Sequence, residues 1–314
     1  MRLGRKPKKI DGLRQAVYVR RYADVPLLMK VNRMKHVLIL LFTLALNSIA
    51  ALAQDKQIIG PDTIIVSSDT VQLRALVWYP KQNGPFPAIF FSHGRSITLE
   101  ERIKKTSQVK ILGELFARHG YLFFALFRRG EGLSLDQGIQ ISQLLERERT
   151  EKGPKAADQL QVHLLESREL SDALAGLAKL KSISTVDPNR IGVVGHSFGG
   201  SLSLLLASRD TTLKGVTNFA GAAGSWNLLD LQRTLVNAVE RLNAAVFFVF
   251  AANDYSVEPG NILNAKMGAK GKIHQLKIFP SFGTSAAEGH NIIYDAIDHW
   301  ESDVFTFLDK YVKR

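Results

Sequence analysis

A serine at position 197 lies in the segment GHSFG, residues 195–199, between a segment that predicts a strand and a segment that predicts a helix. A serine on such a sharp turn is held in a strained backbone conformation, and the flanking glycines allow strand and helix to approach closely. Its side chain then lies beside the helix N-terminus, whose free N–H groups stabilise a developing negative charge. The pattern indicates a nucleophile for acyl transfer; the alternative is a glycine-rich structural turn.

A serine hydroxyl is a weak nucleophile at neutral pH and needs a histidine base and an acid that orients the base. With this kind of turn, the acid and then the histidine follow the serine along the chain. Asp254 comes shortly after the apolar segment 245–251, and His290 lies between the last predicted strand and the last predicted helix. His290 is favoured by elimination, because the other histidines fall in the N-terminal segment, on or at the end of predicted helices, at a strand start or inside the turn. Asp230 and Glu258 are weaker alternatives to Asp254, which could also be a solvated turn residue.

Strands and helices alternate along residues 54–314, which predicts an α/β fold with a mostly parallel central sheet and helices on both faces. In such sheets the reactive groups lie on loops beyond the carboxyl ends of the strands. Because no internal repeat or long Pro/Ser linker interrupts this stretch, we expect a single domain. The predicted strands are 62–67 and 71–78, an antiparallel pair, then 88–92, 121–127, 190–195, 215–219, 245–251 and 274–279. The predicted helices are 108–119, 137–181 with a break at residues 153–154, one that opens near 202–207, and 292–311.

Several stretches of the chain resemble the α/β-hydrolase superfamily, and within it the dienelactone-hydrolase-like and prolyl-oligopeptidase-like serine esterases and peptidases. These stretches are FPAIFFSHGR at 86–95, FRRGEGLS at 127–134, VDPNRIGVVGHSFGG at 186–200, AANDYSVEP at 251–259 and EGHN at 288–291. The resemblance implies an α/β-hydrolase fold for nearly all of residues 54–314.

Residue by residue, the resemblance implies Ser197 as the nucleophile, Asp254 as the orienting acid and His290 as the general base. It also implies that the backbone N–H groups of Arg95 and Phe198 bind the oxyanion. Dienelactone hydrolase itself is similar but uses a cysteine nucleophile, whereas this chain has a serine and contains no cysteine. We therefore expect hydrolysis of carboxylic esters through an acyl-enzyme intermediate.

Basic residues are concentrated near the N-terminus. Residues 1–53 carry 11 Lys and Arg against two Asp, which is +9 of the net charge of +12. Three basic residues precede the largely apolar run 37–46, and residues 51–53 place alanines three and one positions before Gln54. This arrangement is typical of a secretory signal peptide. The apolar run is well short of the roughly 20 residues that span a bilayer, so we expect no stable membrane span after cleavage.

The expected organisation is a basic leader at 1–33, a signal peptide at 34–53 and an exported catalytic domain at 54–314, in the periplasm or outside the cell. Signal peptides usually begin close to their charged region, so Met29 or Met34 is a better start than the first residue, and part of the leader is then a mis-assigned extension. With most of the basic charge in the leader, nucleic acid is not an expected partner.

The predicted site looks open. Residues 222–243, where many relatives insert a cap, are only about one helix long, which favours small or extended acyl substrates. The helical stretch 137–181 is longer than a minimal crossover, and its 146–155 part either forms a charged, solvated helix pair, which we favour, or overhangs the pocket.

Arg95, Arg128 and Arg129 follow predicted strands, where they either form structural ion pairs, the favoured interpretation, or receive an acidic substrate. A small or oligomeric ester is the expected substrate. The alternatives are a prolyl-oligopeptidase-like peptidase, an acetyl-xylan-type carbohydrate esterase and, from another class, a non-catalytic envelope binding protein. No metal-binding or phosphate-binding motif occurs, so neither a metal nor a cofactor is expected.

Overall fold

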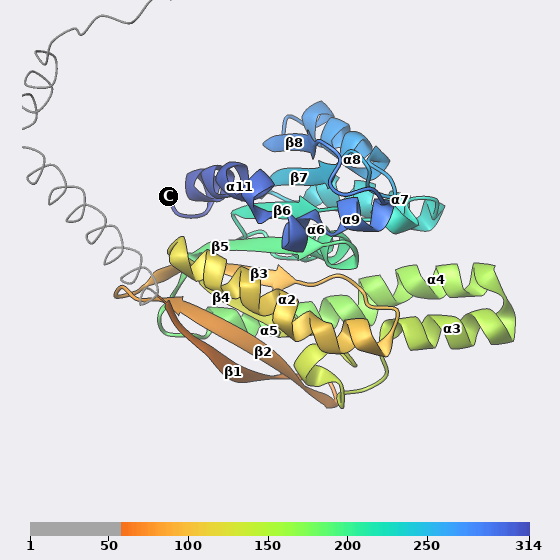
Figure 1. The fold of residues 1–314 in the computed structure, drawn as a ribbon, viewed down its shortest axis with the longest axis horizontal. Coiled ribbons are helices and arrows are strands. Elements are labelled where there is room, and N and C mark those ends of the chain that lie inside the picture. Colours follow the sequence, from red (N-terminus) through yellow and green to blue (C-terminus); the bar gives the residue numbers. More distant parts are fainter. Residues whose placement is uncertain (1–57) are drawn as a thin grey trace, which may run out of the picture. The chain divides into compact units, whose positions relative to one another are not determined.

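A computed structural model describes residues 58–314 (Figure 1). The predicted leader 1–33 and signal peptide 34–53 lie outside the described residues. Within the described part of the chain, eight strands form one sheet in the order β1-β2-β4-β3-β5-β6-β7-β8. The strands are β1 (Ile58–Ser68), β2 (Val71–Pro80), β3 (Phe86–Ser92), β4 (Leu122–Phe127), β5 (Val186–His196), β6 (Gly215–Phe219), β7 (Ala245–Ala251) and β8 (His274–Phe279).

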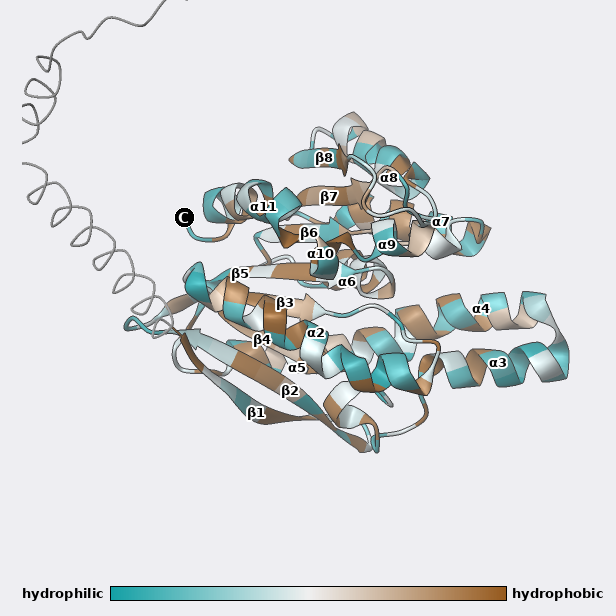
Figure 2. Ribbon diagram, in the orientation of Figure 1, coloured by the Kyte–Doolittle hydropathy of each residue, from teal (hydrophilic) through white to brown (hydrophobic). Residues whose placement is uncertain are grey.

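The sheet is mostly parallel. Strand β2 pairs antiparallel with β1 and with β4, and every pair from β4 through β3 to β8 is parallel. The carboxyl ends of β3, β5 and β7 therefore meet at one edge, where the sequence predicts the chemistry. Strands β3, β4 and β7 are buried along their whole length, which explains their continuous apolar sequences (Figure 2).

Helices cover both faces of the sheet (Figure 1). One apolar core contains residues of α2, α10 and α11, and the other contains residues of α5, α6, α7 and α8. The bounds are α2 (Leu99–Arg118), α3 (Ile141–Lys152), α4 (Pro154–Leu164), α5 (Leu170–Lys181), α6 (Phe198–Arg209), α7 (Leu229–Arg241), α8 (Glu258–Ala269), α9 (Ala286–His290), α10 (Ile292–Asp295) and α11 (Ile297–Tyr311). Short helical segments are η1 (Gly132–Ser134), η2 (Leu165–Glu169, a π-helix) and η3 (Ala223–Ser225).

The helices differ from the sequence prediction in their bounds. Helix α2 begins at Leu99 rather than near 108, because Thr98 and Glu101 form a capping box at its N-terminus. The predicted helix 292–311 is broken at Ala296 into α10 and α11. Helix α8 was not predicted, and His290 lies at the end of the short helix α9 rather than in a loop.

The predicted break in the stretch 137–181 is present. Gly153 adopts a φ of 89°, a conformation that favours glycine, and Pro154 begins α4. Helices α3 and α4 thus form a hairpin that extends beyond the carboxyl edge of the sheet (Figure 1). Within residues 58–314, none of the helices combines the length and apolar character needed to cross a membrane.

Candidate active site

Ser197 lies on the turn between β5 and α6 with φ 55° and ψ −118°, a strained conformation for a residue other than glycine. The surrounding glycines are required by backbone contacts. A Cβ atom on Gly199 would lie 2.0 Å from the carbonyl oxygen of Ser92, and one on Gly195 would lie 2.2 Å from the carbonyl oxygen of Gly199. This close packing of α6 against β3 and β5 presents the serine side chain at the carboxyl edge of the sheet.

The structure brings the three side chains of the predicted triad together. Ser197 Oγ lies 2.8 Å from His290 Nε2, and Asp254 Oδ1 lies 2.7 Å from His290 Nδ1. The Asp254 side chain is fully buried, whereas that of His290 is 12% exposed. An ionised carboxylate can only accept, so Nδ1 carries the imidazole proton and Nε2 is free to accept the proton of the serine hydroxyl.

Asn253 holds the loop that presents His290. Its Nδ2 donates hydrogen bonds of 2.8 Å to the carbonyl oxygens of Phe282 and Ser285, and its Oδ1 accepts one from the Phe282 N–H. Ser285 and Glu288 then form a capping box at the start of α9. Asn253 was not predicted as a site residue; its only signal in the sequence is its place beside Asp254.

His196, inside the turn that carries Ser197, contacts the backbone of His290, the predicted general base. Its Nε2 lies 2.8 Å from the carbonyl oxygen of His290 and donates to it. Burial lowers the pKa of His196 well below its usual value, and the nearby His290 adds to this effect. His196 is therefore a neutral anchor for His290 rather than a second base.

The two predicted oxyanion donors come from two different turns, one after β3 and one after β5. Arg95 follows β3, Phe198 is the first residue of α6, and both line the cavity in front of Ser197. Among the described residues, neither backbone N–H donates a hydrogen bond to another protein group. Both donors are thus free to bind an oxygen atom of a ligand.

The cavity at Ser197 has a volume of about 460 Å³. Its wall combines the turn after β3, one face of α2, the end of α4 and the segment before α7. The residues that line it include Arg95, Ile97, Lys104, Lys105, Gln108, Gln161, Leu165, Ala222, Ser225, Leu231 and Tyr255. Arg95 is fixed over this cavity because its Nη1 donates to Gln161 Oε1 at 3.0 Å, and Gln161 Nε2 in turn donates to Ser225 Oγ.

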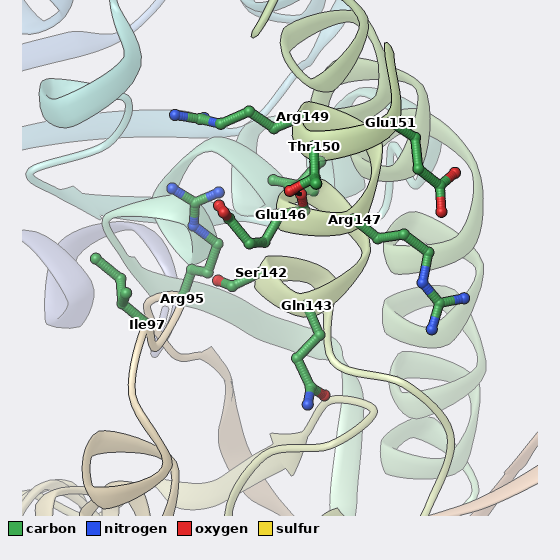
Figure 3. Close-up of a pocket in the computed structure, with 10 residues that line it drawn as sticks. Arg95, Ile97, Ser142, Gln143, Glu146, Arg147, Arg149, Thr150 and Glu151 are labelled. Atoms are coloured by element: carbon green, nitrogen blue, oxygen red, sulfur yellow. Dashed lines mark hydrogen bonds between the residues drawn. The ribbon is translucent and has the colours of Figure 1, made fainter. Parts of the chain in front are cut away.

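A groove of about 760 Å³ adjoins the cavity and shares Arg95 and Ile97 with it. Figure 3 shows that its other wall is α3, from which Glu146 and Arg149 point toward the side of Arg95. The hairpin that was predicted as a charged, solvated pair therefore also borders the approach to Ser197.

Arg128 and Arg129 form buried ion pairs, as favoured from the sequence. Arg128 Nε lies 3.1 Å from Glu169 Oε2, and Arg129 Nε lies 2.8 Å from Asp172 Oδ2. All four side chains are at least 90% buried. Neither arginine lines the cavity at Ser197.

Lys105 is a further cavity residue that sequence reasoning missed. It lies on α2 and is 6% exposed, yet within residues 58–314 it forms no ion pair and donates no hydrogen bond. Burial lowers its pKa, whereas the nearby Glu131 raises it. Its position in the sequence, in a charged helix, gave no signal, because the same pattern is typical of a solvated helix face.

Within residues 58–314, no group of three acidic or histidine side chains lies close enough together to hold a metal ion. Ser197, His290 and Asp254 instead form a chain of hydrogen bonds that runs from hydroxyl to imidazole to carboxylate. This arrangement can activate an oxygen nucleophile next to two free N–H donors.

Solved structures with known activities have the same fold. An acylaminoacyl peptidase from Pyrococcus horikoshii matches with a TM-score of 0.60 and 14% identity; the match covers 84% of this chain and 44% of the peptidase. An esterase from Pyrococcus furiosus matches with a TM-score of 0.55 and 15% identity, covering 80% of this chain and 92% of the esterase. The chain thus spans less than half of the peptidase. These similarities confirm the predicted α/β-hydrolase fold.

Fold and family together define this protein as a hydrolase with the α/β-hydrolase fold. The model of the dienelactone hydrolase family matches residues 73–312, and the chain belongs to that family, as the sequence motifs predicted. A Synechocystis sp. protein that has provisionally been named a carboxymethylenebutenolidase is 21% identical over 196 residues, 62% of this chain and 72% of that protein.

The two buried histidines of the site predict how stability depends on pH. Burial lowers the pKa of His93 and of His196 well below the usual 6.5, so the folded state stays neutral where the unfolded chain takes up protons. The free energy of unfolding should be constant near pH 8 and fall as the pH drops below about 6.5, by about 1.4 kcal/mol per pH unit for each histidine.

Urea unfolding between pH 5 and pH 8 measures this dependence. The carboxyl groups whose pKa values are lowered by hydrogen bonds and ion pairs act mainly below about pH 5, outside this range; they are Asp136, Asp187, Asp210 and Glu288. His196→Gln should lower the dependence of the free energy of unfolding on pH by about 1.4 kcal/mol per pH unit, the contribution of one histidine. An unchanged dependence on pH would contradict the prediction.

Proposed function

We propose that this protein is an exported serine hydrolase that cleaves carboxylic esters through a Ser197–His290–Asp254 triad. The observation that carries the proposal is the continuous chain of hydrogen bonds from Ser197 Oγ through the His290 imidazole to Asp254 Oδ1, set on a strained strand-to-helix turn. Membership of a hydrolase family is consistent with it.

In the first step Ser197 Oγ attacks the ester carbonyl while His290 Nε2 takes the hydroxyl proton and then gives it to the leaving alcohol. Asp254 holds the imidazole in the required tautomer and stabilises the imidazolium. The N–H groups of Arg95 and Phe198 bind the oxyanion of the tetrahedral intermediate. In the second step His290 activates a water molecule, which hydrolyses the acyl-enzyme and restores the serine.

The substrate is an ester that carries an anionic group near its carbonyl. Support comes from Lys105, a largely buried side chain in the cavity wall whose amine has no hydrogen-bond or ion-pair partner among the described residues. A buried charge without a partner is costly, and a carboxylate or phosphate on the substrate would supply the missing one. Arg95 adds a second positive charge to the cavity wall.

Export is proposed from the N-terminal segment, where basic residues precede the apolar run 37–46 and a small-residue site at 51–53. Cleavage after Ala53 would leave residues 54–314, in which the charge is nearly balanced. The protein would then act in the periplasm or outside the cell.

Removal of the nucleophile tests the mechanism. Ser197→Ala should lower kcat for 4-nitrophenyl acetate by at least about 10⁴-fold without changing the unfolding midpoint by more than a few degrees. Asp254→Asn should have a smaller effect, because Asp254 orients the base and does not react. A fluorophosphonate probe should label the parent and not Ser197→Ala; turnover that survives in Ser197→Ala would refute the assignment.

Charge selectivity tests the substrate class. The monoanionic 4-nitrophenyl ester of adipic acid and its neutral methyl ester share the same scissile ester and differ in the charge of the distal carboxyl group and by one methyl group. Lys105→Met should lower the ratio of kcat/KM for the anionic over the neutral ester by about tenfold, the effect of one hydrogen bond to a charged group. Lys110→Met is the matched control, because it removes the same charge from an exposed position on the same helix that does not line the cavity. Equal effects of the two variants would contradict the prediction.

N-terminal sequencing of the protein recovered from the periplasm or culture medium tests export. The expected first residue is Gln54. A mature chain that still contains Val37 would show that cleavage does not occur at this site.

A further inference from the structure

Arg128, the residue after β4, lies behind the turn that carries the Arg95 N–H. Its side chain is 3% exposed and does not line the cavity at Ser197. Its Nη1 donates to the carbonyl oxygen of His93 at 2.6 Å, and its Nη2 donates to the carbonyl oxygen of Gly94 at 3.2 Å. The guanidinium therefore donates hydrogen bonds to two consecutive carbonyls of one turn, in addition to its ion pair with Glu169.

The Gly94 carbonyl and the Arg95 N–H belong to the same peptide group. Because that group is planar and its C=O and N–H point in opposite directions, a donor that fixes the oxygen also fixes the direction of the N–H. A cationic donor on the oxygen also polarises the group, which makes the N–H a stronger hydrogen-bond donor. Arg128 can thus act on an oxyanion without touching it.

A second donor strengthens this effect on the Gly94 carbonyl. The Arg128 N–H donates to His93 Nε2 at 3.2 Å, so the imidazole proton is on Nδ1, which lies 2.8 Å from the Gly94 oxygen. The Gly94 oxygen accordingly accepts from both His93 and Arg128. The turn is also held on its far side, where Ser96 bonds to Glu131 through its N–H and its hydroxyl.

The same guanidinium contacts the other oxyanion residue. Its Cζ atom lies 5.2 Å from the centre of the Phe198 ring, within the range of a cation–π interaction. Glu169, at the end of the π-helical segment η2, compensates its charge and is itself paired with Arg168. The guanidinium is therefore held by the two carbonyls, by Glu169 and by the Phe198 ring.

From these contacts, we propose that Arg128 is a positioning residue for the oxyanion hole: it aims and polarises the Arg95 N–H through the Gly94 carbonyl. The proposal rests on the proposed serine mechanism. Because an oxyanion forms only in the transition state and the tetrahedral intermediate, loss of Arg128 should lower kcat and leave KM nearly unchanged.

Arg129 provides a matched control. It is the next residue, its side chain is 10% exposed, and it forms a buried ion pair with Asp172, but it has no hydrogen bond to the oxyanion turn. Each variant leaves one partner on the remaining carboxylate, since Glu169 keeps Arg168 and Asp172 keeps the Ser68 hydroxyl. Both substitutions thus remove a buried ion pair of similar kind.

The experiment compares Arg128→Met and Arg129→Met in steady-state hydrolysis of 4-nitrophenyl acetate and in binding of phenylboronic acid, which forms a tetrahedral adduct with a nucleophilic serine. For Arg128→Met we expect kcat to fall about 10²-fold, KM to stay within about threefold, and boronate affinity to fall in parallel with kcat. For Arg129→Met we expect the unfolding midpoint to fall and kcat to stay within about threefold.

Equal losses of kcat in the two variants, or a loss for Arg128→Met that appears in KM alone, would overturn the proposal. If Arg128→Met does not fold, the same comparison of kcat is made between Arg128→Lys and Arg129→Lys. Lysine keeps the charge but lacks the planar fork that reaches two carbonyls, so kcat should fall about tenfold in Arg128→Lys only, and a parental kcat would overturn the proposal. Failure of the serine mechanism would appear separately, as turnover that survives in Ser197→Ala.

Discussion

The site depends on one backbone constraint, the contact between the start of α6 and the carboxyl ends of β3 and β5. Gly199 packs so closely on the carbonyl oxygen of Ser92 that no side chain fits there. This contact forces Ser197 into its strained conformation and places the N-terminus of α6 beside it. The strain is tolerated because the turn is held between a buried strand and a buried helix.

Each loop around the serine is then held by hydrogen bonds from a polar side chain outside the predicted triad. Asn253 holds the segment that leads to His290, His196 holds the carbonyl of His290, and Arg128 and Glu131 hold the turn after β3. The two buried charges among them, Arg128 and Glu131, contribute little net stability, because desolvation offsets much of their attraction. Their value lies in geometry: each removes freedom from a loop that would otherwise move relative to the nucleophile.

Prediction from the sequence succeeded where burial decides the pattern. Strand β7 begins and ends at the predicted residues, because a strand buried on both faces is a continuous apolar run. Prediction from the sequence failed where a single local contact determines the end of a helix. The start of α2 depends on the Thr98 capping box in a charged segment, and the last helix breaks at Ala296 although its apolar pattern continues.

By itself, the sequence determined the α/β-hydrolase fold, the family and the choice of Ser197, Asp254 and His290 as a group, since order along the chain and place after a strand are local properties. Only the tertiary structure shows that Lys105 is buried in the cavity wall and that Arg128 bonds to the turn after β3. Both are charged residues in segments whose pattern fits a solvated surface or a structural ion pair, and their roles depend on groups from distant parts of the chain. Burial without a partner, or a hydrogen bond to a carbonyl 34 residues away, arises only when the sheet brings those segments together.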